Sequence, residues 1–237
     1  MKKAFFIDYN QYSAAFNMAA DFFIHKKCEL ENCCFLRFYG FINKTITLGR
    51  FQKADFLNNN EYNDYDKAFR MSGGRAVFHE NDFTYCFTSS FDFFEDKSIK
   101  ASYNKISKPF INVLSQKGIE VDVYKKASKD YFSKELCFSS VSLYEIKSNG
   151  KKLLGSAQYR TDKALSQHGT MYYEIPSFYK NNRFSEDIEM CSLVKEKDFI
   201  MLLKNEFEKV FNVKFENYIF SSQDKQNILN LGEKFEI

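Results

Sequence analysis

Cys137 and Lys152, which lie fifteen positions apart, are two residues whose side chains could act together on an acyl group. The thiolate is the reactive form of cysteine, and a nearby positive charge lowers the pKa of the thiol and favours that form. The pairing therefore suggests a cysteine nucleophile that works beside a lysine ammonium. Each residue also has an ordinary interpretation, because an isolated cysteine is usually a buried structural thiol and a lysine after a turn at Gly150 is usually solvated.

The segment Ser72-Gly73-Gly74-Arg75 could bind a ligand through its backbone. Its centre carries no side chains, so the chain can approach a ligand closely and present amide donors. A glycine pair before a strand is also a common plain turn. This segment alone therefore leaves both interpretations open.

Histidine and cysteine do not indicate a metal site in this chain. The three histidines form no cluster with the spacing of metal ligands, and a lone histidine is commonly a hydrogen-bonded core residue. The six cysteines show no spacing typical of a zinc site or a disulfide framework, and the adjacent Cys33 and Cys34 are expected to be buried small hydrophobes. We therefore predict no bound metal.

Three blocks of sequence, in this order, carry a family resemblance. The first joins Leu36–Tyr39 with Ile46–Gln52, the second is Arg70–His79, and the third runs with gaps from Leu136 to Thr170. Together with a first helix around Asn17–Asp21, they resemble the cysteine-dependent octanoyltransferases of the lipoate and biotin protein ligase superfamily. The resemblance covers about residues 13–172.

The resemblance implies a catalytic role for Cys137 and Lys152. In the octanoyltransferases a cysteine precedes the lysine segment and is followed by a Tyr-Glu pair, as Tyr144 and Glu145 are here. The family's lysine ammonium points at the reacting carbonyl, where a cation stabilises the developing oxyanion. ATP-dependent lipoate ligases have an Asn-Asp-type segment at this place and no such thiol, which favours a transferase. Lys151 is expected to be solvated.

A further set of residues lies in the matching blocks and is expected to form the walls of the acyl-binding pocket. The set contains Gly49, Arg70, Ser72, Gly73, Gly74, His79, Gly155, Ser156, Ala157, His168 and Gly169. No metal ligand is among them.

The implied activity is octanoyl transfer in the assembly of the lipoyl cofactor. The thiolate would attack the thioester of an octanoylated acyl carrier protein, and a lysine of a lipoyl-accepting protein, such as glycine-cleavage H protein or a dehydrogenase lipoyl domain, would then take the acyl group. A thioester intermediate preserves the activation of the acyl group, so no cofactor is expected.

Three alternatives remain open. The first is an ATP- and magnesium-dependent lipoate-protein ligase, against which the lack of an obvious accessory C-terminal domain argues. The second is an amidotransferase that moves octanoyl between lipoyl proteins. The third is a protein that only binds lipoyl domains, and the intact Cys137 and Lys152 argue against it.

Some positions depart from the family pattern. Phe69 stands where an arginine usually precedes Arg70, so one contact to an anion is missing. Asn43-Lys44 stands where prolines are common, and Lys163 and Ser166 replace a usual glycine and leucine. These differences affect substrate preference more than the chemistry.

Length and composition fit one catalytic domain over residues 1–237. A hydrophobic content of 44% is enough for a core, and a net charge of +3 is too small to indicate nucleic-acid binding. The start resembles a signal peptide, but Asp8 and the polar residues after it end the apolar stretch too early. No stretch approaches the roughly 18 apolar residues of a membrane helix, so we expect a soluble, cytoplasmic protein.

Periodicity predicts the elements that position these residues. Ser13 is a candidate N-cap for a helix whose core stripe contains Ala15, Met18, Ala19, Phe22 and Phe23. A second helix is expected over 102–117, ended by Gly118, with Pro109 either kinking it or moving its start towards Lys108. A third should begin after Asp198 and bury Phe199, Leu203, Phe207 and Val210.

Strands are expected between these helices. Residues 35–39 and 44–48 read as a hairpin, 75–78 and 83–89 as strands flanking a turn, and 119–124, 142–147 and 169–174 as further strands, with a solvated connection over 58–66. The predicted fold class is α+β, with a mixed, largely antiparallel sheet flanked by helices. The resemblance implies the same answer, the catalytic fold that biotin and lipoate protein ligases share with class II synthetases.

Overall fold

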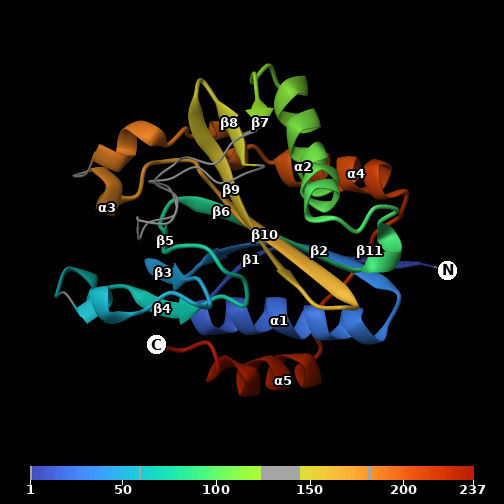
Figure 1. The fold of residues 1–237 in the computed structure, drawn as a ribbon, viewed down its shortest axis with the longest axis horizontal. Coiled ribbons are helices and arrows are strands. Elements are labelled where there is room, and N and C mark those ends of the chain that lie inside the picture. Colours follow the sequence, from blue (N-terminus) through green and yellow to red (C-terminus); the bar gives the residue numbers. More distant parts are fainter. Residues whose placement is uncertain (1, 59, 124–144, 181–182) are drawn as a thin grey trace.

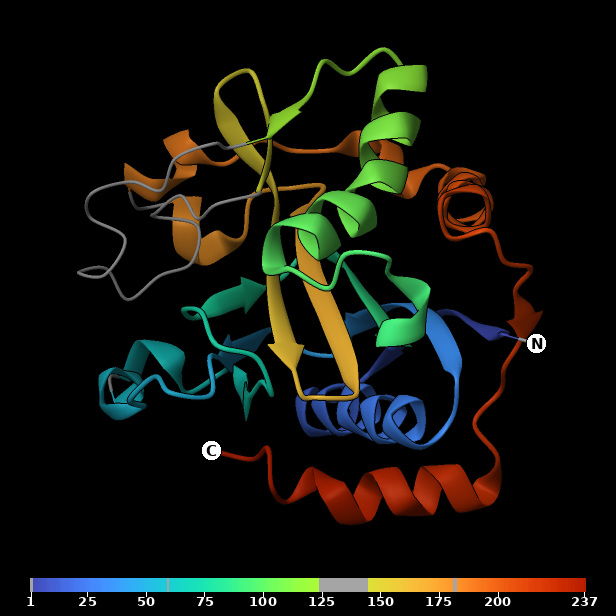
Figure 2. The ribbon, with the colours of Figure 1, turned by 45° about the vertical axis from the view of Figure 1, so that its right-hand side comes forward.

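An eight-stranded sheet runs through the protein, and helices cover both of its faces (Figures 1 and 2). The computed structural model describes residues 2–58, 60–123, 145–180 and 183–237. Helices α1 and α5 pack on one face, and α2 and α4 pack on the other. The helices are α1 (Ala14–Leu30), α2 (Ile99–Gln116), α3 (Ser177–Lys180), α4 (Phe199–Phe211) and α5 (Ser222–Gly232).

The main sheet has the strand order β11-β1-β2-β6-β10-β9-β8-β7. Strand β1 is parallel to β2 and β11, and the remaining neighbours are antiparallel, which confirms the predicted mixed, largely antiparallel sheet. A second sheet has the order β4-β3-β5. The strands are β1 (Lys3–Tyr12), β2 (Cys33–Phe41), β3 (Thr45–Leu48), β4 (Asp66–Phe69), β5 (Val77–His79), β6 (Asp82–Ser90), β7 (Asp122–Val123), β8 (Ile146–Ser148), β9 (Lys151–Arg160), β10 (Ala164–Tyr172) and β11 (Glu216–Asn217).

The hairpin predicted over residues 35–39 and 44–48 is wrong. Both segments are strands, but β2 pairs with β1 and β6 in the main sheet, whereas β3 pairs with β4 and β5 in the small one. Both edges of β2 are occupied, so β3 has no edge on which to pair. The strands predicted on either side of the turn at 80–82 are also confirmed as strands, and they too belong to different sheets.

Helix α1 begins where its cap predicts, and its buried face matches the predicted stripe only at Met18 and Ala19. Ser13 Oγ accepts a hydrogen bond from the backbone N–H of Phe16 at 3.3 Å, which confirms the N-cap. Phe22 and Phe23 are half-buried and contact the C-terminal segment, while the fully buried face includes the polar residues Asn17 and Asp21. Ala15, also expected in the core stripe, is half-buried as well.

Helix α2 is longer than predicted at its start. The helix begins at Ile99 under a cap by Ser98, which accepts a hydrogen bond from the backbone N–H of Ala101, so a start near Lys108 is wrong. Pro109 lies inside the helix, whose ribbon changes direction along its length (Figure 2). Gly118, at φ +81°, follows its end as predicted. Asp198 is the N-cap residue of α4, as predicted, although its side chain makes no capping bond.

The other strand predictions met mixed outcomes. Of the strand expected over 119–124, the described residues contain β7, and residue 124 lies outside them. Residues 142–144 of the next expected strand also lie outside the described residues, and its remaining part contains the start of β8. The third expected strand begins earlier, as β10. The connection over 58–66 contains short 3₁₀ turns before β4. The apolar start of the chain is β1, and β9 and α5 were not predicted. Within the described residues, no helix is long and apolar enough to cross a membrane.

Candidate active site

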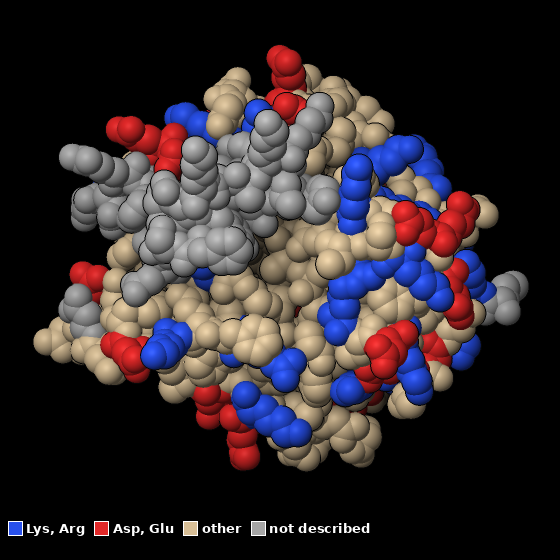
Figure 3. Space-filling view, viewed as in Figure 1, with Lys and Arg blue, Asp and Glu red and all other residues tan. Residues whose placement is uncertain are grey.

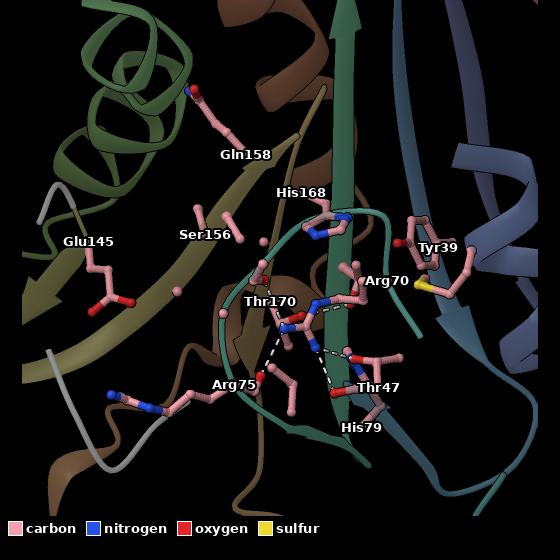
Figure 4. A pocket seen from close by; sticks show the side chains of 18 of the residues that line it. Tyr39, Thr47, Arg70, Arg75, His79, Glu145, Ser156, Gln158, His168 and Thr170 are labelled. Carbon is pink, nitrogen blue, oxygen red and sulfur yellow. Dashed lines mark hydrogen bonds between the residues drawn. The ribbon is translucent and has the colours of Figure 1, made fainter. Parts of the chain in front are cut away.

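A cavity of about 200 Å³ opens where β9 and β10 meet the small sheet, α1 and α2. The face shown in Figure 3 is hollowed near its centre, and Figure 4 shows most of the lining side chains. The described residues that line it are Met18, Tyr39, Thr47, Arg70, Gly73, Gly74, Arg75, Val77, His79, Thr84, Tyr103, Glu145, Gly155, Ser156, Ala157, Gln158, His168, Gly169 and Thr170.

The glycine turn at residues 73–74 forms one wall and fits against Gly49. A Cβ added to Gly49 would lie 2.0 Å from the carbonyl oxygen of Gly74, closer than any real contact. The backbone N–H of Arg50 also donates to the carbonyl of Ser72 at 2.9 Å. Gly74 has a φ of +96°, which a residue with a side chain rarely adopts. The turn therefore needs glycine at Gly49 and at Gly74.

Arg70 braces this turn against β3. Its guanidinium donates to the carbonyl and the hydroxyl of Thr47 at 2.6 and 2.9 Å. It also donates to the carbonyls of Gly73 and Arg75 at 3.3 and 2.8 Å (Figure 4). Because these acceptors belong to the loop and to the strand, the arginine fixes the position of the cavity wall.

His79 is held on both ring nitrogens. Nδ1 lies 2.7 Å from a carboxylate oxygen of Asp82, and Nε2 lies 2.8 Å from Oγ1 of Thr47. A carboxylate can only accept, so the contact with Asp82 assigns a proton to Nδ1.

His168 links the glycine turn to α1. Its Nε2 lies 2.5 Å from Oγ of Ser72, and its Nδ1 lies 3.7 Å from Oδ2 of Asp21. Burial lowers the pKa of His168, while Asp21 opposes that shift. The neutral ring is therefore favoured, and it accepts the Ser72 hydroxyl proton at Nε2.

Asp21 is the centre of a buried polar network that the sequence analysis missed. The carboxylate accepts hydrogen bonds from Arg37 at 2.8 Å and from Tyr39 at 2.8 Å. Burial raises its pKa, but the charge of Arg37 and the bonds from His168 and Tyr39 outweigh that effect, so the pKa is lowered. Asn17, Asp21 and His25 recur every fourth residue, and this spacing was the available signal for a buried polar face.

Lys152 forms a buried ion pair with Glu145. Lys152 Nζ lies 3.0 Å from Oε1 of Glu145, and each side chain is only 2% exposed. Successive residues of a strand point to opposite faces, so Lys151 on β9 is exposed, as predicted. Glu145 lines the cavity, and Lys152 contacts it. Cys137 and Tyr144 lie outside the described residues.

Close contact between β9 and β10 forms the opposite wall. A Cβ on Gly169 would lie 2.5 Å from Ser156 Oγ and 2.6 Å from the carbonyl of Gly155. The hydroxyls of Ser156 and Tyr85 are 3.0 Å apart, and Gln167 donates to Tyr85 at 2.7 Å. The wall is thus a rigid, hydrogen-bonded surface.

Most of the predicted pocket residues lie together. Arg70, Gly73, Gly74, His79, Gly155, Ser156, Ala157, His168 and Gly169 line the cavity, whereas Gly49 and Ser72 support it from behind. Ten further lining residues were not predicted from the sequence: Met18, Tyr39, Thr47, Arg75, Val77, Thr84, Tyr103, Glu145, Gln158 and Thr170. All of them except Thr84 and Tyr103 stand inside the matching segments and could have been included.

Phe69, Lys163 and Ser166, the departures from the pattern, lie away from the lining. Phe69 packs in the hydrophobic cluster of the small sheet, and Lys163 is exposed in the turn between β9 and β10. Ser166 is buried and lies 2.8 Å from Nδ1 of His25. Within the described residues, no group of three or more His, Cys, Asp or Glu side chains could hold a metal.

Comparisons with known proteins agree on one family. The family model of the lipoyl protein ligase A/B catalytic domain matches residues 13–197. A protein named octanoyltransferase LipM from Clostridioides difficile is 35% identical over 182 residues, which are 71% of this chain and 66% of that protein. One of the same name from Carboxydothermus hydrogenoformans is 34% identical, over 72% of this chain and 65% of that protein. The chain thus spans just under two thirds of these two relatives.

A third octanoyltransferase LipM, from Oceanobacillus iheyensis, is 28% identical over 96% of this chain and 92% of that protein. Among solved structures, a lipoate-protein ligase A bound with ATP has a TM-score of 0.76 at 17% identity, covering 99% of this chain and 95% of that one. A putative lipoate protein ligase from T. acidophilum with bound lipoic acid also has a TM-score of 0.76, at 18% identity and the same coverage. These two structures confirm the fold.

Proposed function

This chain belongs to the family of lipoyl protein ligase A/B catalytic domains, and we propose that it is an octanoyltransferase that works through a thioester on Cys137. The observation that carries the proposal is the similarity to relatives named octanoyltransferase, combined with a buried Lys152 that is paired with the cavity-lining Glu145. The donor would be an octanoylated acyl carrier protein. The acceptor would be a lysine of a lipoyl-accepting protein, such as glycine-cleavage H protein or a dehydrogenase lipoyl domain.

In the first step, the thiolate of Cys137 attacks the thioester carbonyl of the donor. The bond from carbon to the cysteine sulfur forms, the bond to the donor sulfur breaks, and the donor thiolate takes a proton from solvent. Lys152 and backbone amides stabilise the negative charge on the carbonyl oxygen during the attack. The cavity, walled by the glycine turn and by β9 and β10, holds the eight-carbon chain.

In the second step, the neutral amine of the acceptor lysine attacks the octanoyl-Cys137 thioester. An amide bond forms, the bond from carbon to the cysteine sulfur breaks, and the proton that the nitrogen loses passes to the leaving thiolate or to solvent. Because the donor and the intermediate are both thioesters, the activation of the acyl group is kept and no ATP is needed.

The alternative is an ATP-dependent lipoate-protein ligase, which the fold alone would also suit. Such an enzyme must bind the phosphate of an acyl-adenylate, for which additional arginines are useful. Here Phe69 occupies one arginine position of the family pattern, and Arg70 donates to loop carbonyls. These contacts favour the transferase over the ligase.

Mass spectrometry of the intact protein tests the proposal. Wild-type protein incubated with octanoyl carrier protein and no nucleotide should gain one octanoyl group, which hydroxylamine removes and which passes to added acceptor protein. Cys137→Ala should gain none. Acceptor incubated with lipoate, ATP and magnesium should gain nothing. ATP-dependent lipoylation that is undiminished in Cys137→Ala would show the chain to be a ligase.

A further inference from the structure

One end of the cavity is open to solvent. Among the residues that line it, Gly74 is exposed, and Arg75, Ser156 and Gln158 are only partly buried. These residues come from the glycine turn and from β9, which form the two facing walls. A ligand therefore enters between the turn and β9.

The other end of the cavity is closed by buried side chains. Met18 is 3% exposed, Tyr39 is 1% exposed, and Thr47 is fully buried. In Figure 4, Tyr39 and Thr47 lie on one side of the cavity, and Ser156 and Arg75 lie on the other. The part of a ligand that enters first therefore ends against these buried residues.

The tether of an acyl thioester fixes which end of the acyl chain reaches the closed end. The carbonyl is attached to the carrier protein, and the methyl end of the chain is free. A folded carrier protein is far larger than a cavity of about 200 Å³, so the thioester stays at the open end. Burial of the apolar chain is favourable, and its methyl end extends towards the closed end.

Hydrogen bonds hold the backbone around the closed end in place. The hydroxyl of Tyr39 donates to Asp21 at 2.8 Å, and the guanidinium of Arg37 lies 4.1 Å from the centre of the Tyr39 ring. Arg37 also donates to Asp21 at 2.8 Å, and the side-chain amide of Asn17 donates to the carbonyl of Gly40 at 2.9 Å. Helix α1 and strand β2 are thus fixed to each other, and neither can withdraw from a longer ligand.

Met18 differs from its neighbours at the closed end because it contributes volume and no hydrogen-bond donor. It is the only described residue of α1 that lines the cavity. It lies three residues before Asp21, on the same face of the helix, and it belongs to the same hydrophobic cluster as Tyr39. Its side chain can therefore be shortened or enlarged without removing a member of the polar network.

We propose that Met18 ends the acyl pocket and sets the longest acyl chain that the protein accepts. The inference rests on the proposed function, because it concerns the chain-length preference of that reaction. A chain longer than octanoyl has to displace Met18 or leave methylene groups in water at the open end. A shorter chain leaves a gap beside Met18 and loses contacts with it.

The experiment lets donors of different chain length compete in one tube. Hexanoyl, octanoyl and decanoyl carrier proteins are mixed in equal amounts with acceptor protein, and the acyl groups transferred to the acceptor are measured by mass spectrometry. The product ratio reports relative kcat/KM and does not depend on how much of the enzyme is folded. Wild type should favour octanoyl. Met18→Ala should raise the ratio of decanoyl to octanoyl by about 10- to 200-fold, the range that one methylene group contributes in a hydrophobic pocket. Met18→Phe should shift the preference towards hexanoyl.

The matched control is Met71→Ala, which removes the same side chain from the same hydrophobic cluster but not from the cavity lining. This variant should keep the wild-type product ratio. An unchanged ratio in Met18→Ala, or an equal change in Met71→Ala, would overturn the inference.

A binding measurement separates this inference from the proposed function. A wild-type protein that transfers no acyl group from any donor would overturn the proposed function. Thermal stabilisation by free hexanoate, octanoate and decanoate needs no transfer, and Met18→Ala should show the same shift towards the longer chain. If Met18→Ala and wild type are stabilised by the three acids in the same order and to the same extent, Met18 does not end the pocket.

Discussion

Lys152, the proposed oxyanion-stabilising residue, also has a structural role because its charge is buried. An exposed lysine can be removed at little cost in stability, but removing one partner of a buried ion pair leaves the other charge uncompensated, at a cost of roughly 3–5 kcal/mol. Here both partners are 2% exposed. A variant at this position therefore changes stability as well as rate, and the two effects have to be measured separately.

Lys152→Ala should lower the rate of octanoyl transfer by about 10²- to 10³-fold, the loss typical when one group that stabilises an oxyanion is removed. It should also lower the free energy of unfolding by roughly 3–5 kcal/mol, because Glu145 loses its partner. Lys151→Ala, at an exposed residue, should change neither. Transfer kinetics well below the melting temperature, with urea unfolding, measure both quantities. Equal rate losses at both positions would mean that the wrong lysine was assigned.

The sequence predicts site residues where a motif carries them. Gly73, Gly74 and His168 lie in blocks that resemble a known family, and the structure brings them to one cavity. Asp21 and Tyr39 also lie in matching segments, but the hydrogen bond that joins them, between α1 and β2, arises only from tertiary packing. A buried partner on another element leaves no local signal in the sequence.

At the scale of elements, the glycine turn depends on how two loops fit together. Gly49 directly follows β3, and its Cα faces the carbonyl of Gly74 without room for a methyl group. Arg70 then bonds both sides of this contact. These contacts join the turn to the small sheet.

Gly49→Ala should displace the turn while the fold persists. A Cβ 2.0 Å from the Gly74 oxygen has to push the turn by about 1 Å, and a shift of that size at a substrate-positioning residue can reduce kcat/KM by about 10²-fold. The control is Gly232→Ala on α5, where the nearest atom to the new Cβ is 3.9 Å away. Steady-state kinetics on both variants measure the effect, and an active Gly49→Ala would show that the turn yields without cost.

Helices and their first residues could be predicted from the sequence, but the pairing of the strands could not. Helices α2 and α4 show their periods locally, and Ser13 and Asp198 mark starts that the structure confirms. Strand pairing depends on segments that are distant in the sequence. The hairpin predicted from the closeness of β2 and β3 in the sequence is therefore wrong, because β2 pairs with β6 and β3 pairs with β5. Strand β9 was missed because its alternation is interrupted by Gly155 and by the polar residues that face the cavity.

For the molecule as a whole, α1 connects the cavity to the core. Its buried face carries Met18, which lines the cavity, and Asp21, which holds Arg37 and Tyr39. One turn further along, His25 lies 2.8 Å from Ser166 on β10. Polar contacts thus link α1 to the main sheet along the length of the helix. The protonation of polar residues on α1 therefore affects the stability of the entire fold.

The stability of the protein should therefore fall in mild acid, and His25 should account for part of the fall. Burial lowers the pKa of His25 to about 4, although Glu29 opposes the shift, while an unfolded histidine keeps a pKa near 6.5. Between these values the unfolded state binds the extra proton, so the free energy of unfolding decreases as the pH falls from about 6.5 to about 4, by about 1.4 kcal/mol per pH unit at most.

Replacing this histidine by a residue that does not titrate tests the assignment. His25→Gln should remove the His25 contribution and flatten the dependence of unfolding free energy on pH within this window, whatever its effect on stability at pH 7. Urea unfolding of wild type and variant at pH 7, 6 and 5 provides the comparison. The slope that remains belongs to other groups, including His168, whose pKa is also lowered by burial. Identical slopes in both proteins would show that His25 does not contribute to the loss of stability in acid.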